Sequence, residues 1–252
     1  MFRCALMLLM LLVPAAAQAD YFGKFEGKLQ LTEVDDDDPE CKSSHWVGQS
    51  AFRLLAPYSY VDKKGKSWKV PKGTCVNGAS IPIPAQGIVG GPWAGKFKNA
   101  SVIHDYHCTA MLEPWQDVHH MFFEAMLAKG VSRVKAGLMY YAVYAFGPRW
   151  QTVVHNRVAT RSISGCPSGP GGRCRAFVTN TIKTRTVFTP QADQQNEQQM
   201  QQELARVEEL LKQGKLDVDQ IPKFADHTSK VKFSATKVVP RTETTTTYEQ
   251  VK

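Results

Sequence analysis

The sequence lacks the short motifs that identify several large enzyme classes. It has no P-loop, no glycine-rich dinucleotide fingerprint, no H-E-x-x-H zinc motif and no G-x-S-x-G nucleophile elbow. These absences argue against P-loop nucleotide hydrolases, dinucleotide-dependent oxidoreductases, zinc proteases of the H-E-x-x-H type and α/β-hydrolases. No nucleic-acid-binding motif is present either.

Long hydrophobic runs are also missing. The run Ala5–Val13 is too short to cross a bilayer. It follows Arg3 and precedes A-A-A-Q-A, a pattern typical of a signal peptide and its cleavage site. We therefore expect residues 1–19 to be removed, leaving an exported chain, periplasmic or secreted, with no transmembrane segment.

Acidic residues are fewer than basic ones. The chain has 31 Lys and Arg against 23 Asp and Glu, which gives a formal net charge of +8. Removal of Arg3 with residues 1–19 leaves +7, because that segment has no other charged side chain. A basic surface of this size suits an anionic envelope component such as lipid or cell-wall polymer, or nucleic acid, and charge alone selects none of them.

Five cysteines remain after residue 19, and export makes disulfides expected. Cys166 and Cys174 lie in one Gly/Pro-rich loop and are the first predicted pair. Cys41 and Cys75 are the second, joining two loops of the N-terminal region. Cys108 is left over, as either a small buried apolar side chain or a reactive thiol.

The apolar periodicity predicts an α+β fold, with a small antiparallel β region packed on a three-helix core and a C-terminal extension that has one amphipathic helix. Strands are expected at 25–31, 51–61, 67–70 and in a pair within 175–188, and helices at 100–111, 114–128 and 131–146. The expected divisions are a signal peptide (1–19), the α+β core (20–160), a Gly/Pro and disulfide-loop region with strands (161–188) and a Gln-rich helix with a tail (189–252).

The Gln-rich helix, 191–213, has an apolar line that makes it a surface or self-associating helix. It has fewer than three heptads, too few for a long coiled coil. Beyond Ser229 the Thr- and Lys-rich tail is expected to be disordered or docked as an edge strand.

The candidate site centres on A-S-V-I-H-D-Y-H within the first predicted helix. Helical spacing places His104 and His107 on its buried stripe, with Asp105 about 100° around the axis. A short link makes the next helix an antiparallel neighbour, so that His104 and His119 are expected to meet. The alternative is a buried, hydrogen-bonded histidine beside a surface aspartate.

A loop rich in Gly and Pro precedes this helix. V-P-K-G-T-C-V-N-G-A-S-I-P-I-P excludes helix and suits a fixed backbone path. Such a loop presents backbone amides and small polar side chains, here Asn77, Gly78 and Ser80, to a site.

Four ordered blocks resemble the phage- and bacterium-associated domain of unknown function 1353. They are V-P-x-G-x-x-x-N-G-A-S-I-P, A-S-V-I-H-D-Y, F-x-E-A-M-x-x-x-G-V and M-Y-Y-A-V-x-x-F-G, within about 52–147. The resemblance implies a small α+β domain and no established activity. Asn77 stands where that family tends to have Asp, and His119 stands where Asp is usual.

A weaker resemblance links the His-Asp helix pair to secreted phospholipase A2. It implies His104 as the general base for water and Asp105 as a calcium ligand. His119 occupies the place of the Asp that orients the base, and Cys108 that of a Tyr. An oxyanion would be stabilised by the cation or by amides of residues 77–80.

Two other functions use the same residues. His104, His107 and His119 are the ligands of a three-histidine zinc hydrolase in one of them. In the other, the protein is a non-catalytic envelope or phage-derived structural or binding component, and the His-Asp pair only holds two helices together. The sequence leaves calcium, zinc and no metal open.

Overall fold

The structure is a computed structural model that describes residues 22–35, 38–41, 51–78, 93, 95–166, 169–191 and 194–250. For 154–183, 194 and 236–250 it describes the backbone alone. The predicted signal peptide, 1–19, and Ser80 lie outside the described residues.

Two small antiparallel sheets form the N-terminal β region. Their strands are β1 (Lys24–Glu26), β4 (Tyr58–Val61) and β5 (Ser67–Val70), in the order β1-β4-β5, and β2 (Leu31–Val34), β3 (Ala51–Leu54) and β6 (Cys75–Val76), in the order β2-β3-β6. One continuous strand was predicted over 51–61, and that prediction is wrong. The chain is interrupted around Pro57, which has no amide hydrogen for strand pairing, so β3 and β4 belong to different sheets.

Three helices follow, as predicted. After a 3-10 turn, η2 (Gly95–Phe97), they are α2 (Lys98–Ala110), α3 (Trp115–Ala128) and α4 (Arg133–Phe146). Ser132 caps α4, because its side chain accepts a hydrogen bond from the Lys135 amide at 3.4 Å. The β region packs on α2, where the rings of Trp68 and His107 lie 5.1 Å apart. The α+β class is therefore confirmed.

The C-terminal helices belong to the same core. The Gln-rich segment forms α5 (Gln194–Lys212), which is followed by η3 (Val218–Gln220) and a helix not predicted from the sequence, α6 (Ile221–Thr228). The apolar line of α5 is buried in the cluster that contains α4, through Met200, Leu204 and Val207. This line is covered by the chain itself, and self-association through the helix stays a prediction.

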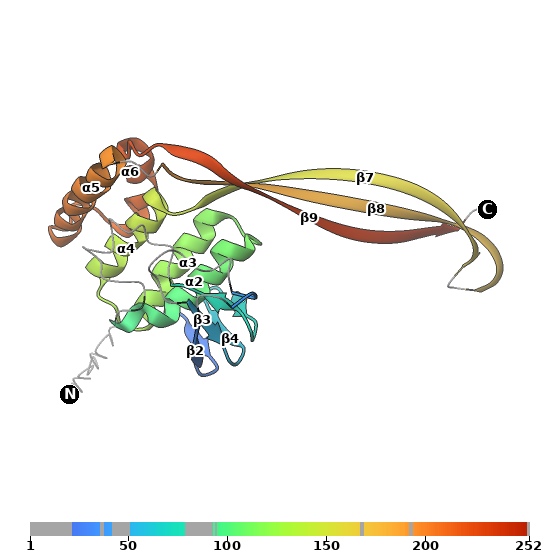
Figure 1. Ribbon diagram of the computed structural model, residues 1–252, viewed down its shortest axis with the longest axis horizontal. Helices are drawn as coiled ribbons and strands as arrows, with labels where there is room; N and C mark the ends of the chain where they lie inside the picture. The colour runs from blue at the N-terminus through green and yellow to red at the C-terminus, as the bar shows by residue number, and fades with distance from the viewer. Residues whose placement is uncertain are drawn as a thin grey trace, which may run out of the picture.

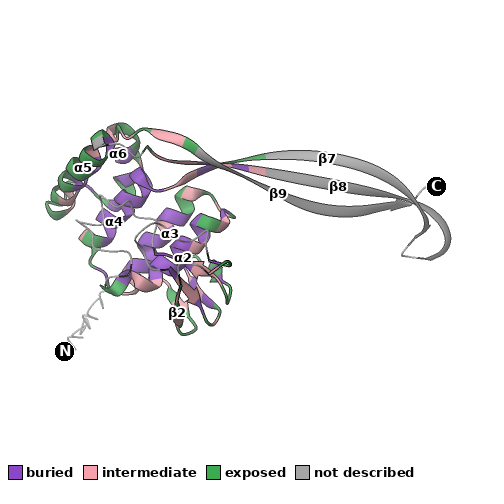
Figure 2. Cartoon of the chain, in the orientation of Figure 1, coloured by how far each residue is buried: buried purple, intermediate pink, exposed green. Residues whose placement is uncertain are grey.

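A long three-stranded sheet extends away from this body (Figure 1). It consists of β7 (Arg149–Cys166), β8 (Gly169–Pro190) and β9 (Phe233–Gln250), with β8 in the centre. The boundary expected at residue 160 falls inside β7. The tail beyond Ser229 was expected to be either disordered or an edge strand, and in the structure it forms the edge strand β9. Figure 2 shows that buried residues gather in α2, α3 and α4, while the outer side of α5 is exposed.

The predicted disulfide between Cys41 and Cys75 is confirmed. It ties the segment before β3 to β6, across 34 residues of sequence. The side chains of Cys166 and Cys174 lie outside the described part of the chain. Within the described residues, no helix has both the length and the apolar character needed to cross a membrane.

The packing of α5 on α4 is testable at Gly137. A Cβ at this position would lie 3.3 Å from Cδ2 of Leu211, so Gly137→Leu would place a large side chain where α5 packs. We expect the variant to lose about 1–3 kcal/mol of unfolding free energy in urea titration. Gly137→Ala is the matched control, since Leu211 can shift slightly and alanine favours helix by about 1 kcal/mol. Equal stability of Gly137→Leu and the wild type would contradict this packing.

Candidate metal centre

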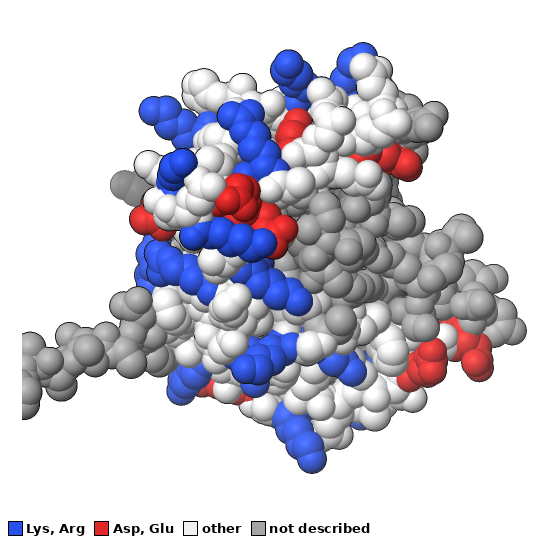
Figure 3. All heavy atoms as spheres, turned by 90° about the vertical axis from the view of Figure 1, so that its left-hand side faces the viewer, with Lys and Arg blue, Asp and Glu red and all other residues white. Residues whose placement is uncertain are grey.

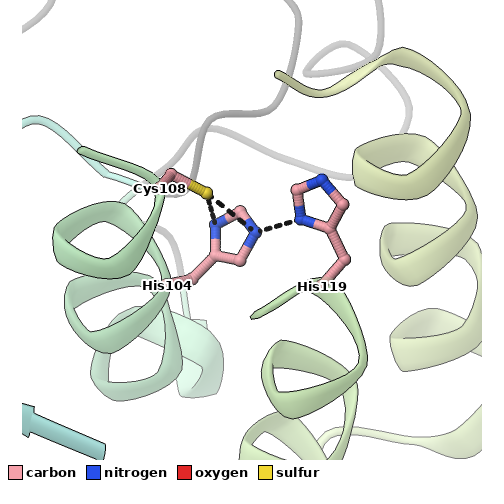
Figure 4. Close-up of side chains that lie close together, drawn as sticks. All are labelled: His104, Cys108 and His119. Carbon is pink, nitrogen blue, oxygen red and sulfur yellow. Dashed lines mark hydrogen bonds between the residues drawn. The ribbon is translucent and has the colours of Figure 1, made fainter. Parts of the chain in front are cut away.

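The antiparallel pair α2 and α3 brings three potential metal ligands together. His104 and Cys108 are four residues apart on α2 and therefore lie on one face of that helix. Met111 ends α2 in the left-handed conformation, and Pro114 begins α3, which carries His119. The turn between them points the three side chains toward one another (Figure 4).

The cluster is tight and buried. Nε2 of His104 lies 2.8 Å from Nδ1 of His119, and Sγ of Cys108 lies 3.5 Å from the same Nε2. One ligand atom from each residue lies within 4.8 Å of the others. Both histidines are 0 % exposed and Cys108 is 5 % exposed. The predicted meeting of His104 and His119 is what the structure shows.

The hydrogen bonds of the cluster fix one arrangement of protons on the two imidazoles. Nε2 of His119 lies 3.3 Å from the Pro148 carbonyl, which can only accept, so this nitrogen carries the proton. Nδ1 of neutral His119 is then an acceptor, and His104 donates to it through Nε2. Nδ1 of His104 is left as an acceptor, and the Cys108 thiol, 3.8 Å away, is a weak donor to it.

Burial keeps both imidazoles neutral. Desolvation, followed by the neighbouring His119 and His107, holds the pKa of His104 well below its usual range. Desolvation also lowers the pKa of His119 to about 3, against a smaller opposite effect of the Pro148 carbonyl. Neutral imidazole is the form that binds a metal ion.

Asp105, the expected calcium ligand, contacts the loop that precedes α2. Its buried carboxylate accepts hydrogen bonds from the Asn77 amide, at 2.7 Å, and from the Gly78 amide. Burial nevertheless raises its pKa to about 7. The loop amides thus bind Asp105, and the carboxylate holds the end of β6 against α2.

His107 does not join the other two histidines. Its ring packs edge-on against Trp68, and no hydrogen-bond partner is present for either ring nitrogen among the described residues. Burial lowers its pKa to about 4. The three-histidine zinc site stays a prediction that this arrangement of His107 does not favour. In the described part of the chain, the third potential ligand beside His104 and His119 is Cys108.

Two of the three ligand separations can be compared with those of a tetrahedral zinc site, and the third, from Cys108 to His119, is within 4.8 Å. Zinc bonds of about 2.0–2.1 Å to nitrogen and 2.3 Å to sulfur place tetrahedral ligands about 3.3 Å apart for two nitrogens and about 3.5 Å for nitrogen and sulfur. The observed separations are 2.8 and 3.5 Å. The two imidazoles would have to separate by about 0.5 Å to admit the ion.

The sequence contained a signal for Cys108 that its apolar setting obscured. Positions 104 and 108 are i and i+4, the spacing that places two ligands on one helical face. Among the described cysteines, Cys41 and Cys75 form a disulfide, and Cys108 stands outside it with its thiol among the buried side chains. That combination of His, Cys and spacing was sufficient to include it in the ligand set.

The four sequence blocks and the fold they form lead to a family. Residues 52–143 match the family described as "Protein of unknown function (DUF1353)". The predicted resemblance is thereby confirmed. No solved structure matches the chain.

Two relatives come from Sinorhizobium fredii (strain NBRC 101917 / NGR234). One, named "Uncharacterized protein y4iH", is 44% identical over 108 residues, which is 42% of this chain and 45% of the relative. The other, named "Uncharacterized protein y4jT", is 36% identical over 181 residues, 69% of this chain and 49% of the relative. The matched part of the chain thus spans less than half the length of either relative.

The buried histidines predict acid sensitivity. Because their folded-state pKa values lie below the ordinary 6.5, the unfolded chain binds more protons as the pH falls. The unfolding free energy should decrease between about pH 6.5 and pH 4, by about 1.4 kcal/mol per pH unit for each histidine. The raised pKa of Asp105 has the opposite effect, because the folded chain then binds the extra proton over this pH range. Its contribution offsets the loss of unfolding free energy from about one histidine.

Urea titration at a series of pH values measures this slope. His107→Phe removes one titrating ring and should make the slope shallower by about a third to a half. His227→Phe, at an exposed position on α6, should leave it unchanged. An identical slope in the wild type and His107→Phe would show that His107 is not buried in its neutral form.

Proposed function

We propose that the chain is an exported zinc-binding protein of the cell envelope, in which His104, Cys108 and His119 hold the ion between α2 and α3. The observation that carries the proposal is the convergence of these three side chains, within 4.8 Å, in a buried site that favours neutral imidazole. The Pro148 carbonyl accepts a hydrogen bond from Nε2 of His119 and so orients the ring with Nδ1 toward the cluster. Metal-bound histidines are commonly oriented in this way.

The donor set favours zinc over calcium. A thiolate and two imidazoles suit zinc, whereas calcium takes six to eight oxygen ligands. Asp105, the ligand expected for calcium, already accepts two amide hydrogen bonds.

The burial of the cluster favours a binding role over catalysis. His104 and His119 are 0 % exposed, and a general base must reach its substrate or a water molecule.

In the binding role, zinc ties α2 to α3, and the projecting sheet of β7, β8 and β9 binds the partner. Residues 149–190, which contain β7 and β8, have no acidic residue and seven basic ones: Arg149, Arg157, Arg161, Arg173, Arg175, Lys183 and Arg185. Their charge suits an anionic lipid or cell-wall polymer.

A zinc hydrolase is the second candidate. Three protein ligands leave a fourth coordination position, and in hydrolytic zinc sites this position holds the water that attacks the substrate. His104 would then be a ligand and not the general base. Zinc-dependent hydrolysis of an activated ester such as p-nitrophenyl acetate, lost in Cys108→Ala, would favour this candidate over the binding role.

Metal analysis tests the site. We expect the purified chain, incubated with zinc and desalted, to retain one zinc ion per chain, and Cys108→Ala to bind zinc at least tenfold more weakly because a thiolate ligand is lost. With cobalt in place of zinc, the wild type should show a thiolate-to-cobalt absorption band that Cys108→Ala lacks.

His107→Phe is the matched control, because it replaces a buried histidine of the same helix that lies outside the cluster. It should retain the zinc affinity and the cobalt band of the wild type. Unchanged zinc affinity in Cys108→Ala, or no retained zinc in a folded wild-type chain, would rule out the proposed site.

A further inference from the structure

A cleft is lined by residues other than those of the candidate metal centre. It is a cleft of about 770 Å³ between the β1–β2 connection, the start of α2 and the end of α3. Its lining residues are Gly27, Lys28, Leu29, Gln30, Leu31, Tyr58, Lys98, Asn99 and Lys129. The volume falls within the range of about 300–1,000 Å³ that is usual for small-molecule sites.

The charge of the cleft has one sign. Three lysines line it, Lys28, Lys98 and Lys129, and no acidic residue does. None of the three forms an ion pair with a described carboxylate, in contrast to Lys63, which contacts Glu124 at 2.8 Å. An uncompensated group of three ammonium ions in a concave site concentrates positive potential there.

Two of these lysines are held in place by aromatic rings. Nζ of Lys129 lies 4.6 Å from the ring centre of Phe25. Nζ of Lys98 lies 5.6 Å from that of Phe52. These contacts reduce the freedom of the long side chains, so that less entropy is lost when a ligand binds.

The lining of the cleft also includes a hydroxyl donor, that of Tyr58. Nδ2 of Asn99 donates to the Tyr58 hydroxyl oxygen at 2.6 Å, and Tyr58 is only 3 % exposed. Since that oxygen accepts from Asn99, the hydroxyl hydrogen is directed elsewhere, and no acceptor for it occurs among the described residues. A nearly buried O–H that lines a cationic cleft is suited to an anionic oxygen of a ligand.

We propose that this cleft binds a small anionic ligand that carries phosphate groups, contacted by Lys28, Lys98, Lys129 and the Tyr58 hydroxyl. Lysine contacts phosphate as a point charge, and the neutral hydroxyl adds direction. The cleft is larger than a single phosphate ion needs, so the ligand has the size of a phosphorylated headgroup or soluble metabolite. Lys and Arg side chains outnumber Asp and Glu on the left half of the face drawn in Figure 3, a charge distribution that attracts anions.

Titration calorimetry with pyrophosphate at low salt tests the proposal on the full chain. We expect saturable binding to the wild type that weakens as salt is added. The double variant Lys98→Gln/Lys129→Gln should bind at least tenfold more weakly, and Tyr58→Phe about fivefold more weakly. Lys72→Gln, at an exposed lysine outside the cleft, is the matched control and should bind as the wild type does.

Vesicles distinguish the two sources of phosphate. Binding to phosphatidylglycerol vesicles but not to phosphatidylcholine vesicles, lost in the double variant, would assign the cleft to a lipid headgroup. Pyrophosphate binding without vesicle binding would assign it to a soluble ligand. The proposal is overturned if pyrophosphate does not bind the wild type, or if the double variant binds it as tightly as Lys72→Gln does.

Discussion

The hydrogen bond between His104 and His119 is the contact on which the arrangement of the helices depends. Two imidazoles that are fully removed from water must satisfy each other or leave unpaired polar atoms in an apolar core, which costs about 1–3 kcal/mol per group. The bond fixes the rotation of α2 against α3. The Pro148 carbonyl extends the chain of hydrogen bonds to the start of β7, where the projecting sheet leaves the body.

Local patterning predicted the helical core because each of its helices carries its own signals. The stripe of α2, the proline before α3 and the serine cap of α4 are features of a few adjacent residues, and they specify where a helix begins and which side is buried. The meeting of His104 and His119 followed from the same information, since a short link makes consecutive helices neighbours.

Features that depend on distant parts of the chain were predicted less well. The apolar line of α5 was recognised, but its partner α4 lies about fifty residues earlier in the chain, and helical periodicity does not say what covers a face. His107 shares the stripe of His104, yet it sits one turn further along, where Trp68 of β5 occupies the neighbouring space. Cys108 is either a small buried apolar side chain or a reactive thiol on sequence grounds, because the spacing of one cysteine does not reveal the two imidazoles that lie beside it.

The proposed zinc site and the hydrogen bond between His104 and His119 would use the same nitrogen atoms. In the structure, the Nε2 proton of His104 lies between the two imidazoles. Zinc binding at the proposed site would require that proton to move to Nδ1 and the Cys108 thiol to lose its own proton, so the proposed affinity would rise with pH. Each ring nitrogen of the pair also has a hydrogen-bond partner, so the packing of α2 on α3 satisfies these buried polar atoms.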